Sequence, residues 1–406
     1  MKAVERKNLV PFCLVTVLFL LWGIANNMTD TLLSAFKRIM TMSDTQTSLI
    51  QFAFYGSYFC FALPAALFIR KYSYKSGVIL GLALYAAGAI LFLPAAKAAS
   101  YAFYLVAIYI LAGGCSILET TANPYILAMG SPETATRRLN IAQAFNPLGS
   151  ITGILLSKYF ILRDISLYSV SGTYMTLGFV LIAVMVVMLC VKMPEGHDAG
   201  GQDTLGASFR RLLRNRRYVF GVVAQFFYVG AQIGVWSFTI RLAMQELGIV
   251  EADGATIYLA SIIGFSASRF VFTWLMKYFA PARLLLFAAA ADVVLALLVA
   301  LTAGSGWLCV GCLVLISVFM SLMFPTIYGI ALDGIEDPKA GGRPGDAKIG
   351  ASGLIMAILG GALLTPLQAL VSDAAGIHLA YLVPMGCFVV VLLFALYTVR
   401  TYKPNH

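Results

Sequence analysis

Charged residues are scarce in this chain of 406 residues. Only 11% of the residues are charged, whereas 60% are hydrophobic, and the mean hydropathy is +0.87. A soluble protein of this length has too little interior to bury so much apolar surface. The composition therefore predicts a protein that crosses a membrane several times.

Long polar segments are also lacking, because twelve apolar runs fill most of the chain. Each run is long enough to cross a hydrocarbon core of about 30 Å, and their continuity argues against barrel strands, which alternate over about ten residues. We therefore expect an all-α integral membrane protein with twelve transmembrane helices. The runs cover residues 9–36, 47–69, 77–95, 101–129, 138–161, 173–193, 219–245, 253–278, 282–303, 307–332, 348–371 and 376–400.

Residues that carry enzyme or metal chemistry are few and scattered. The three histidines, His197, His378 and His406, fall in loops or in the tail, which argues against a histidine proton relay. Cys309 and Cys312 form a C-x-x-C pattern, but inside an apolar helix, where neither a redox role nor a disulfide is expected. No nucleophile–base pair and no metal cluster is evident, so we expect neither catalytic residues, a metal site nor a cofactor. The polar segments are too short for a signalling domain, which argues against a sugar-sensing receptor.

The formal net charge of +10 raises the alternative of a nucleic-acid-binding protein, especially at the basic cluster 210–217. When the twelve spans are placed across the membrane one after another, however, most of the 28 lysines and arginines fall in the segments on one side of the membrane. The positive-inside rule then predicts that both termini are cytoplasmic. We therefore interpret the basic cluster as a topology signal and an anchor to the lipid surface, and expect no nucleic-acid partner.

The spans divide into two groups of six. Residues 194–217 form the longest polar stretch and read as a cytoplasmic linker between an N-terminal bundle, residues 1–193, and a C-terminal bundle, residues 218–406. Such a layout is typical of transporters built from repeats, whose binding site lies at the repeat interface near the middle of the membrane.

Glu119 lies in the run 101–129 and is the only charged residue in it. A carboxylate at that depth costs at least roughly 2.5–3.5 kcal/mol, so its presence indicates a function such as binding a proton, an ion or a polar solute. Burial favours the neutral form of a carboxyl group, which suits a proton carrier. Asp30 is a second candidate in the first run, although it could instead cap a helix or form a structural pair. From the helical rise, we expect the two carboxylates to differ in depth by about 18 Å. They then form two separate sites along one path rather than a pair that shares one proton.

Amide and aromatic side chains accompany these carboxylates. Spacings of three or four residues place several of them on shared helix faces. A carboxylate, amides and tryptophan at one depth suit a polyol, whose hydroxyls form hydrogen bonds and whose apolar ring face stacks on aromatic rings. The candidate binding residues are Trp22, Asn26, Asn27, Glu119, Asn123, Gln143 and Asn146 in the first six spans, and Gln232, Trp236, Phe324 and Tyr328 in the last six.

Structural roles remain alternatives for part of this set. Asn26, Asn27, Asn123 and Gln232 fit equally well as hydrogen-bonding contacts between helices, which are worth roughly 0.6–2 kcal/mol.

Two further charged residues fall within the spans of the second half. For Arg269 and Asp292 we expect a buried structural pair.

Polar motifs throughout the chain resemble the fucose/proton symporter family of the major facilitator superfamily. The resemblance covers essentially the whole chain and rests on polar motifs as well as on hydropathy. The segments that carry it are Leu21-Trp22-Gly23 with Asn26, Asn27 and Asp30, FAFYGSYFCFALPAAL (52–67), LETTANPYI (118–126), LNIAQAFNPLGSITG (139–153), VGAQIGVWSF (229–238), FPTIYG (324–329) and GGALLTPLQALVSDAAG (360–376).

The resemblance implies two six-helix bundles and proton-driven import of L-fucose or a related monosaccharide by alternating access, in a bacterial inner membrane and as a functional monomer. It implies that Asp30 and Glu119 are the protonatable pair, that Gln143 and Asn146 line the sugar cavity, and that Trp22 and Trp236 are cavity tryptophans. Relatives that carry glucose, galactose or N-acetylglucosamine, some of them with sodium, leave a different sugar or coupling ion as the alternative. A transporter of another substrate class is a further alternative, because the same fold serves many substrates.

Overall fold

The chain is built from helices, and the described part contains no strand. The computed structural model describes residues 8–40, 44–161, 166–193, 204–338 and 341–401, including their side chains except at residues 29–38, 44–48, 51, 158 and 251–252. Eleven helical segments of this part are long and apolar enough to cross a membrane. The expected all-α membrane fold is confirmed.

The first half of the chain forms helices that pack closely through glycine. A Cβ atom on Gly88 would lie 2.4 Å from the backbone nitrogen of Leu111, and one on Gly114 would lie 2.3 Å from that of Tyr85. Only glycine therefore allows α3 and α5 to approach so closely. The elements are α1 (Leu9–Ile39), α2 (Asp44–Lys71), α3 (Tyr74–Ile90), α4 (Phe92–Lys97), α5 (Tyr101–Ala128), η2 (Pro132–Thr134), α6 (Ala135–Gln143), α7 (Asn146–Leu156), η3 (Ser157–Ile161) and α8 (Leu167–Cys190).

The second half begins with a short helix inside the segment expected to be a linker. In this helix, α9, Arg211 forms an ion pair with Asp346, with Nε 2.7 Å from Oδ2. The next helix, α10, is capped by the Asn215 side chain at its start and by Gly248 after its last residue, where the φ of 63° favours glycine. The elements are α9 (Leu205–Arg214), α10 (Arg216–Leu247), α11 (Glu251–Leu275), α12 (Pro281–Leu301), α13 (Trp307–Met320), α14 (Met323–Leu332), α15 (Asp346–Met356), α16 (Leu359–Ala375), η5 (Leu379–Tyr381) and α17 (Leu382–Thr401).

Four of the expected spans are interrupted rather than continuous. The breaks lie between α6 and α7, between α13 and α14, between α15 and α16, and between α3 and α4. Pro147 and Pro325 follow the first two breaks, and proline has no N–H to donate to the carbonyl four residues before it. The carbonyls of Gln143 and Ser321 are therefore released from the helical hydrogen-bond pattern.

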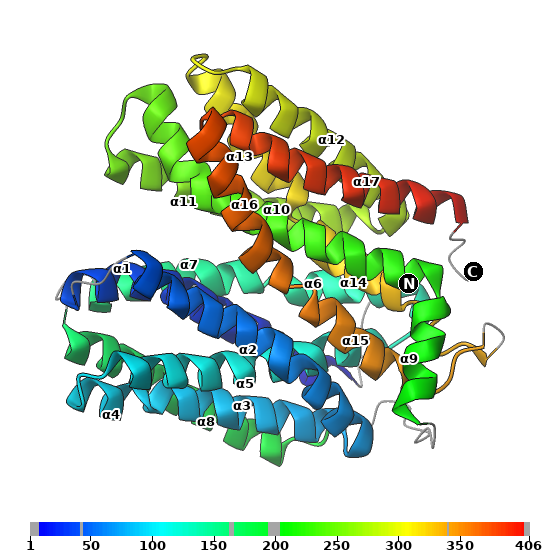
Figure 1. Cartoon of the computed structure of the whole chain (residues 1–406). Helices are drawn as coiled ribbons and strands as arrows, with labels where there is room; N and C mark the ends of the chain where they lie inside the picture. Colours follow the sequence, from blue (N-terminus) through cyan, green and yellow to red (C-terminus); the bar gives the residue numbers. More distant parts are fainter. Residues whose placement is uncertain (1–7, 41–43, 162–165, 194–203, 339–340, 402–406) are drawn as a thin grey trace.

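The two halves lie side by side and meet most closely at one end (Figure 1). We call this the α9 end, because it holds α9 together with the start of α1 and the end of α17. Here the Asn140 side chain donates to the Thr326 hydroxyl at 3.3 Å, and the Lys348 ammonium group donates to the Ile69 carbonyl at 3.2 Å. These contacts join α6 to α14 and α15 to α2, and close the molecule at this end.

Candidate functional site

A cavity of about 460 Å³ lies between the two halves. Its volume is within the range of roughly 300–1,000 Å³ that is usual for sites of small ligands. The cavity is lined by most of the residues that the sequence predicted, drawn from α1, α5, α6, α7, α10 and α14. These are Trp22, Asn26, Asn27, Glu119, Gln143, Asn146, Gln232, Trp236 and Phe324.

Glu119 of α5 lines this cavity, and 5% of its surface is exposed. Tyr58 of α2 lines the cavity as well. The Gln143 side chain donates to the amide oxygen of Asn123 at 2.8 Å. Asn123 itself does not line the cavity, so it orients Gln143 from behind.

Close contact between α1 and α7 fixes the next part of the wall. A Cβ atom on Gly23 would lie 2.2 Å from the carbonyl oxygen of Asn146, so glycine is required at this position. The Asn146 side chain donates to the carbonyl of Phe19 at 3.1 Å, and the Phe19 ring packs on Trp22 with 4.3 Å between centroids. These contacts restrict the orientation of both Asn146 and Trp22.

Aromatic side chains form much of the wall in the second half. The indole N–H of Trp236 donates to the Ser317 hydroxyl at 3.2 Å, and its ring meets that of Phe265 edge to face at 5.1 Å. Phe324 stacks on Tyr328 with 6.4 Å between centroids. Tyr328 is fully buried behind Phe324 and does not line the cavity.

Several buried polar atoms in and beside the cavity have no hydrogen-bond partner among the described residues. Such atoms are rare in folded proteins, and each calls for a ligand or a water molecule that satisfies it. The atoms are Asn26 Oδ1 in the wall, and Asn123 Nδ2 and Tyr328 Oη behind it. A ligand that carries several hydroxyl groups could satisfy donors and acceptors of this kind.

Arg269 does not pair with Asp292, and the expectation of a buried ion pair is wrong. The guanidinium group instead donates from Nε to the Ser321 carbonyl at 2.6 Å and from Nη1 to the Gln143 carbonyl at 2.9 Å. These are the two carbonyls that Pro325 and Pro147 release, one in each half. The released carbonyls hold Arg269, while neither carboxylate oxygen of Asp292 has a hydrogen-bond partner within the described chain.

Sequence reasoning missed Arg269 and Tyr58 as cavity residues. A signal existed for Arg269, because a charged residue within a span indicates a function by the same rule that singled out Glu119. No signal distinguishes Tyr58 among the 20 tyrosines of the chain. Asp30 belongs to α1, but its side chain lies outside the described part of the structure.

Comparisons with known proteins agree with this architecture. Residues 12–343 match the family described as Major Facilitator Superfamily. An L-fucose-proton symporter from Haemophilus influenzae is 42% identical, with 99% of each chain covered. A glucose/galactose transporter from Brucella abortus is 32% identical, with 94% of this chain and 92% of the relative covered.

A solved structure extends the agreement to the fold. The crystal structure of the Major Facilitator Superfamily transporter FucP in the outward conformation superposes with a TM-score of 0.87 at 36% identity, and covers 97% of this chain and 99% of the other. The relatives are transporters and not enzymes. Together with the helical fold and the central cavity, these matches show that the chain belongs to the fucose–proton symporter family of the Major Facilitator Superfamily.

Proposed function

We propose that this chain is a proton-coupled symporter that imports L-fucose or a related monosaccharide by alternating access. The observation that carries the proposal is the combination within one cavity of a buried carboxyl group, Glu119, with unsatisfied hydrogen-bonding atoms and aromatic rings. A sugar uses all three features, because its hydroxyls donate and accept while its apolar face packs on aromatic rings. The 42% identical relative is an L-fucose-proton symporter, which supports the same function.

Sugar recognition is assigned to the residues that face the cavity and to those that orient them. Asn26, Asn27, Gln143, Asn146 and Gln232 supply amide groups, which both donate and accept hydrogen bonds. In this proposal the aromatic rings pack on the apolar face of the sugar, and two buried side chains support the cavity wall from behind. The rings are those of Trp22, Trp236 and Phe324, and the supporting side chains are those of Asn123 and Tyr328.

Proton coupling is assigned to Glu119 and Asp30. When protonated, Glu119 is neutral and can donate a hydrogen bond to a sugar hydroxyl, and loss of the proton places an unpaired charge in the cavity. The bound proton thus favours bound sugar, and its release favours sugar exit. Asp30 sets proton entry, so we expect Asp30→Asn to retain exchange of sugar for sugar while proton-driven accumulation falls.

The transport cycle follows from the contacts between the halves. Asn140–Thr326 and Lys348–Ile69 close the α9 end, so sugar enters the cavity from the opposite end. The α9 end then opens as the opposite end closes. With both termini cytoplasmic, as the positive-inside rule predicts, this cycle imports sugar.

The remaining assignments concern organisation and location. We propose six-helix bundles at residues 1–193 and 218–406, joined by a linker at 194–217 that includes α9. The protein is proposed to work as a monomer in the lipid bilayer of a bacterial inner membrane, with sugar and proton as its substrates and with no cofactor.

Transport by the purified full-length protein tests the proposal. In proteoliposomes, we expect labelled L-fucose to accumulate when a pH gradient, acidic outside, is imposed without sodium. Unlabelled sugars then compete in the order of their affinity. If accumulation requires a sodium gradient, or if labelled glucose or galactose accumulates while L-fucose does not, the second candidate replaces the proposal. That candidate is a glucose/galactose transporter, which the 32% identical relative favours.

A further inference from the structure

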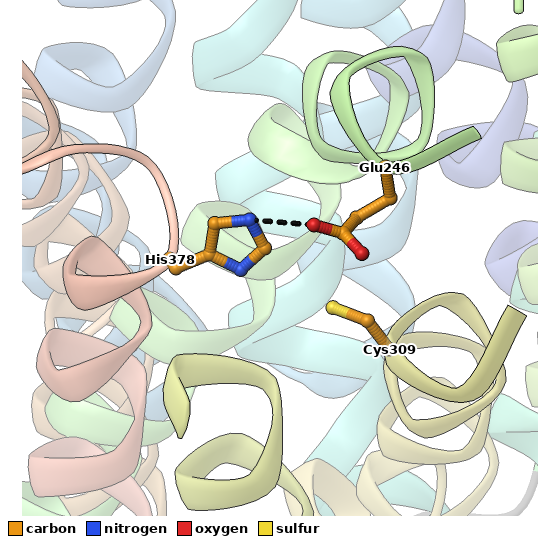
Figure 2. Close-up of side chains that lie close together, drawn as sticks. All are labelled: Glu246, Cys309 and His378. Carbon is orange, nitrogen blue, oxygen red and sulfur yellow. Dashed lines mark ion pairs between the residues drawn. The ribbon is translucent and has the colours of Figure 1, made fainter. Parts of the chain in front are cut away.

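Three side chains with metal-ligating atoms converge at the end of the molecule opposite to the α9 end. Glu246 lies near the last residue of α10, Cys309 near the first residues of α13, and His378 between α16 and η5. Their ligand atoms all lie within 4.8 Å of one another. Figure 2 shows the three side chains pointing toward one region from three separate elements, with His378 Nε2 at 2.8 Å from a carboxylate oxygen of Glu246.

We propose that Glu246, Cys309 and His378 form a binding site for a divalent transition metal ion, with zinc as the best match. Histidine nitrogen, thiolate sulfur and carboxylate oxygen are the three kinds of ligand that zinc takes in proteins, and three protein ligands leave a fourth position for water. In a tetrahedral zinc site with normal bond lengths, the ligand atoms are about 3.3–3.6 Å apart. Side-chain movements on the order of 1 Å or less therefore convert the observed cluster into such a site.

Backbone groups around the cluster already hold two of the ligands in the orientation that a metal needs. Glu246 accepts hydrogen bonds from the backbone N–H groups of Gly304 and Gly306, each at 2.9 Å. These glycines have φ values of 77° and 59°, so the turn that presents their N–H groups favours glycine. Metal-bound carboxylates commonly have such outer hydrogen bonds, which fix the ligand geometry.

His378 is oriented by a backbone carbonyl. Its Nδ1 lies 3.2 Å from the Val299 carbonyl oxygen, and the Cys309 sulfur lies 3.9 Å from the same oxygen. In the ion pair with Glu246, Nε2 carries the hydrogen that points at the carboxylate, while Nδ1 donates to Val299. A metal ion bound here would take the place of the Nε2 hydrogen, and Nδ1 would keep its donation to the carbonyl, as metal-bound histidines usually donate their other N–H to a carbonyl or carboxylate.

Burial distinguishes the cluster from a chance gathering of surface side chains. Cys309 is fully buried, and the side chains of Glu246 and His378 are 2% and 11% exposed. A metal ion bound here would fasten the ends of α10 and α13 to the connection before η5. The sequence did not indicate this site, because its three ligands are far apart in the chain and belong to separate helices.

Metal binding by the purified full-length protein in detergent tests the proposal. The exposed cysteines, Cys13, Cys60 and Cys190, are first replaced by serine so that surface thiols do not bind metal. After chelation, we expect equilibrium dialysis to give one zinc ion per chain and the Tm to rise with zinc concentration, because an ion that binds only the folded state stabilises it. Cobalt as a substitute probe should give a thiolate-to-metal charge-transfer band.

Two ligand variants and one matched control sharpen the test. Cys309→Ser and His378→Gln keep a polar side chain at each position, and each should weaken zinc binding at least about tenfold. Cys312→Ser alters a second buried cysteine of α13 outside the cluster and should bind zinc as the parent does. Tm values measured with chelator present separate loss of metal from misfolding. The proposal is overturned if the parent binds no more zinc than Cys309→Ser and His378→Gln, if cobalt gives no thiolate band, or if Cys312→Ser weakens binding as strongly.

Discussion

At the scale of single residues, the cavity depends on polar side chains whose orientation is set from outside the cavity. Asn123 holds Gln143, and the Phe19 carbonyl holds Asn146. Orientation before binding reduces the entropy that a sugar-bound site loses, because the side chains need not be ordered by the ligand. We therefore expect the amides to contribute to affinity in proportion to how firmly they are held.

Gln143→Leu tests this expectation. The substitution removes an amide from the cavity wall and leaves Asn123 without the donor of its 2.8 Å hydrogen bond. In the complex the sugar hydroxyl that met this amide is left unsatisfied, at a cost of about 1–3 kcal/mol. Because 1.4 kcal/mol corresponds to a factor of ten, L-fucose affinity should fall about tenfold or more in calorimetric titration. Gln225→Leu is the control, because Gln225 is a fully buried amide outside the cavity. Equal affinity in parent and Gln143→Leu, or equal losses in both variants, would contradict the assignment.

Much of the site could be predicted at this scale, because membrane burial makes polar residues conspicuous. Glu119, Gln143 and Asn146 stand out in apolar runs, and helical spacing places them at one depth. The partner of Arg269 could not be predicted, because the rule that buried charges pair with opposite charges pointed to Asp292. Two carbonyls released by prolines, on different halves of the chain, compete with that carboxylate, and spacing along the sequence does not reveal them.

At the scale of helices, three of the interrupted spans place cavity residues next to their breaks. Gln143 and Asn146 flank the break between α6 and α7, Phe324 follows the one after α13, and Ile358 lies at the one between α15 and α16. Released backbone carbonyls are tolerated at membrane depth only where another group satisfies them. Arg269 does so for two of these breaks at once.

A double-mutant cycle measures the link between the proline break and Arg269. Arg269→Lys replaces a planar group with several donors by a single ammonium group, which cannot reach both carbonyls in the same geometry. Pro325→Ala restores the N–H that can satisfy the Ser321 carbonyl within the helix. We therefore expect Arg269→Lys to lower the free energy of unfolding in mixed micelles by about 1 kcal/mol less in the Pro325→Ala background than alone. Additive effects of the two substitutions would contradict the link.

The breaks themselves were not predicted from the sequence. Hydropathy treats 138–161, 307–332 and 348–371 as continuous, and prolines also occur inside helices that stay unbroken, as Pro64 does in α2 and Pro124 in α5. Whether a helix continues depends on the partners that its released carbonyls find, and those partners come from other helices. The positions of the spans follow from apolar length alone, which explains why eleven of the twelve expected spans were predictable, all but the broken 138–161.

At the scale of the whole molecule, the closure of the α9 end sets which side of the cavity is open. Lys348 is 4% exposed, donates to the Ile69 carbonyl and lies 4.7 Å from the centroid of the Tyr74 ring. It therefore attaches the second half to the first at a buried point. Loss of this attachment should shift the population toward conformations with the α9 end open.

Lys348→Met makes that shift measurable through a cysteine placed at Thr136, which touches Gly329 across the halves. In a background without the exposed cysteines, the thiol of Thr136→Cys should react faster with a maleimide when Lys348 is replaced, because α6 and α14 separate more often. Lys75→Met is the control. Lys75 donates to the carbonyls of Leu189 and Val191 within the first half, so its loss should leave the rate unchanged. Unchanged labelling in Lys348→Met would show that this residue does not hold the α9 end closed.

Coupling of proton and sugar through Glu119 is tested most directly by pH-driven accumulation of L-fucose in proteoliposomes that contain Glu119→Gln. Asp292→Asn, which alters a fully buried carboxyl group outside the cavity, is the matched control. We predict that Glu119→Gln does not concentrate the sugar above its external level, whereas Asp292→Asn accumulates it as the parent does. Undiminished accumulation by Glu119→Gln would contradict the assignment of Glu119 as the group at which proton and sugar meet.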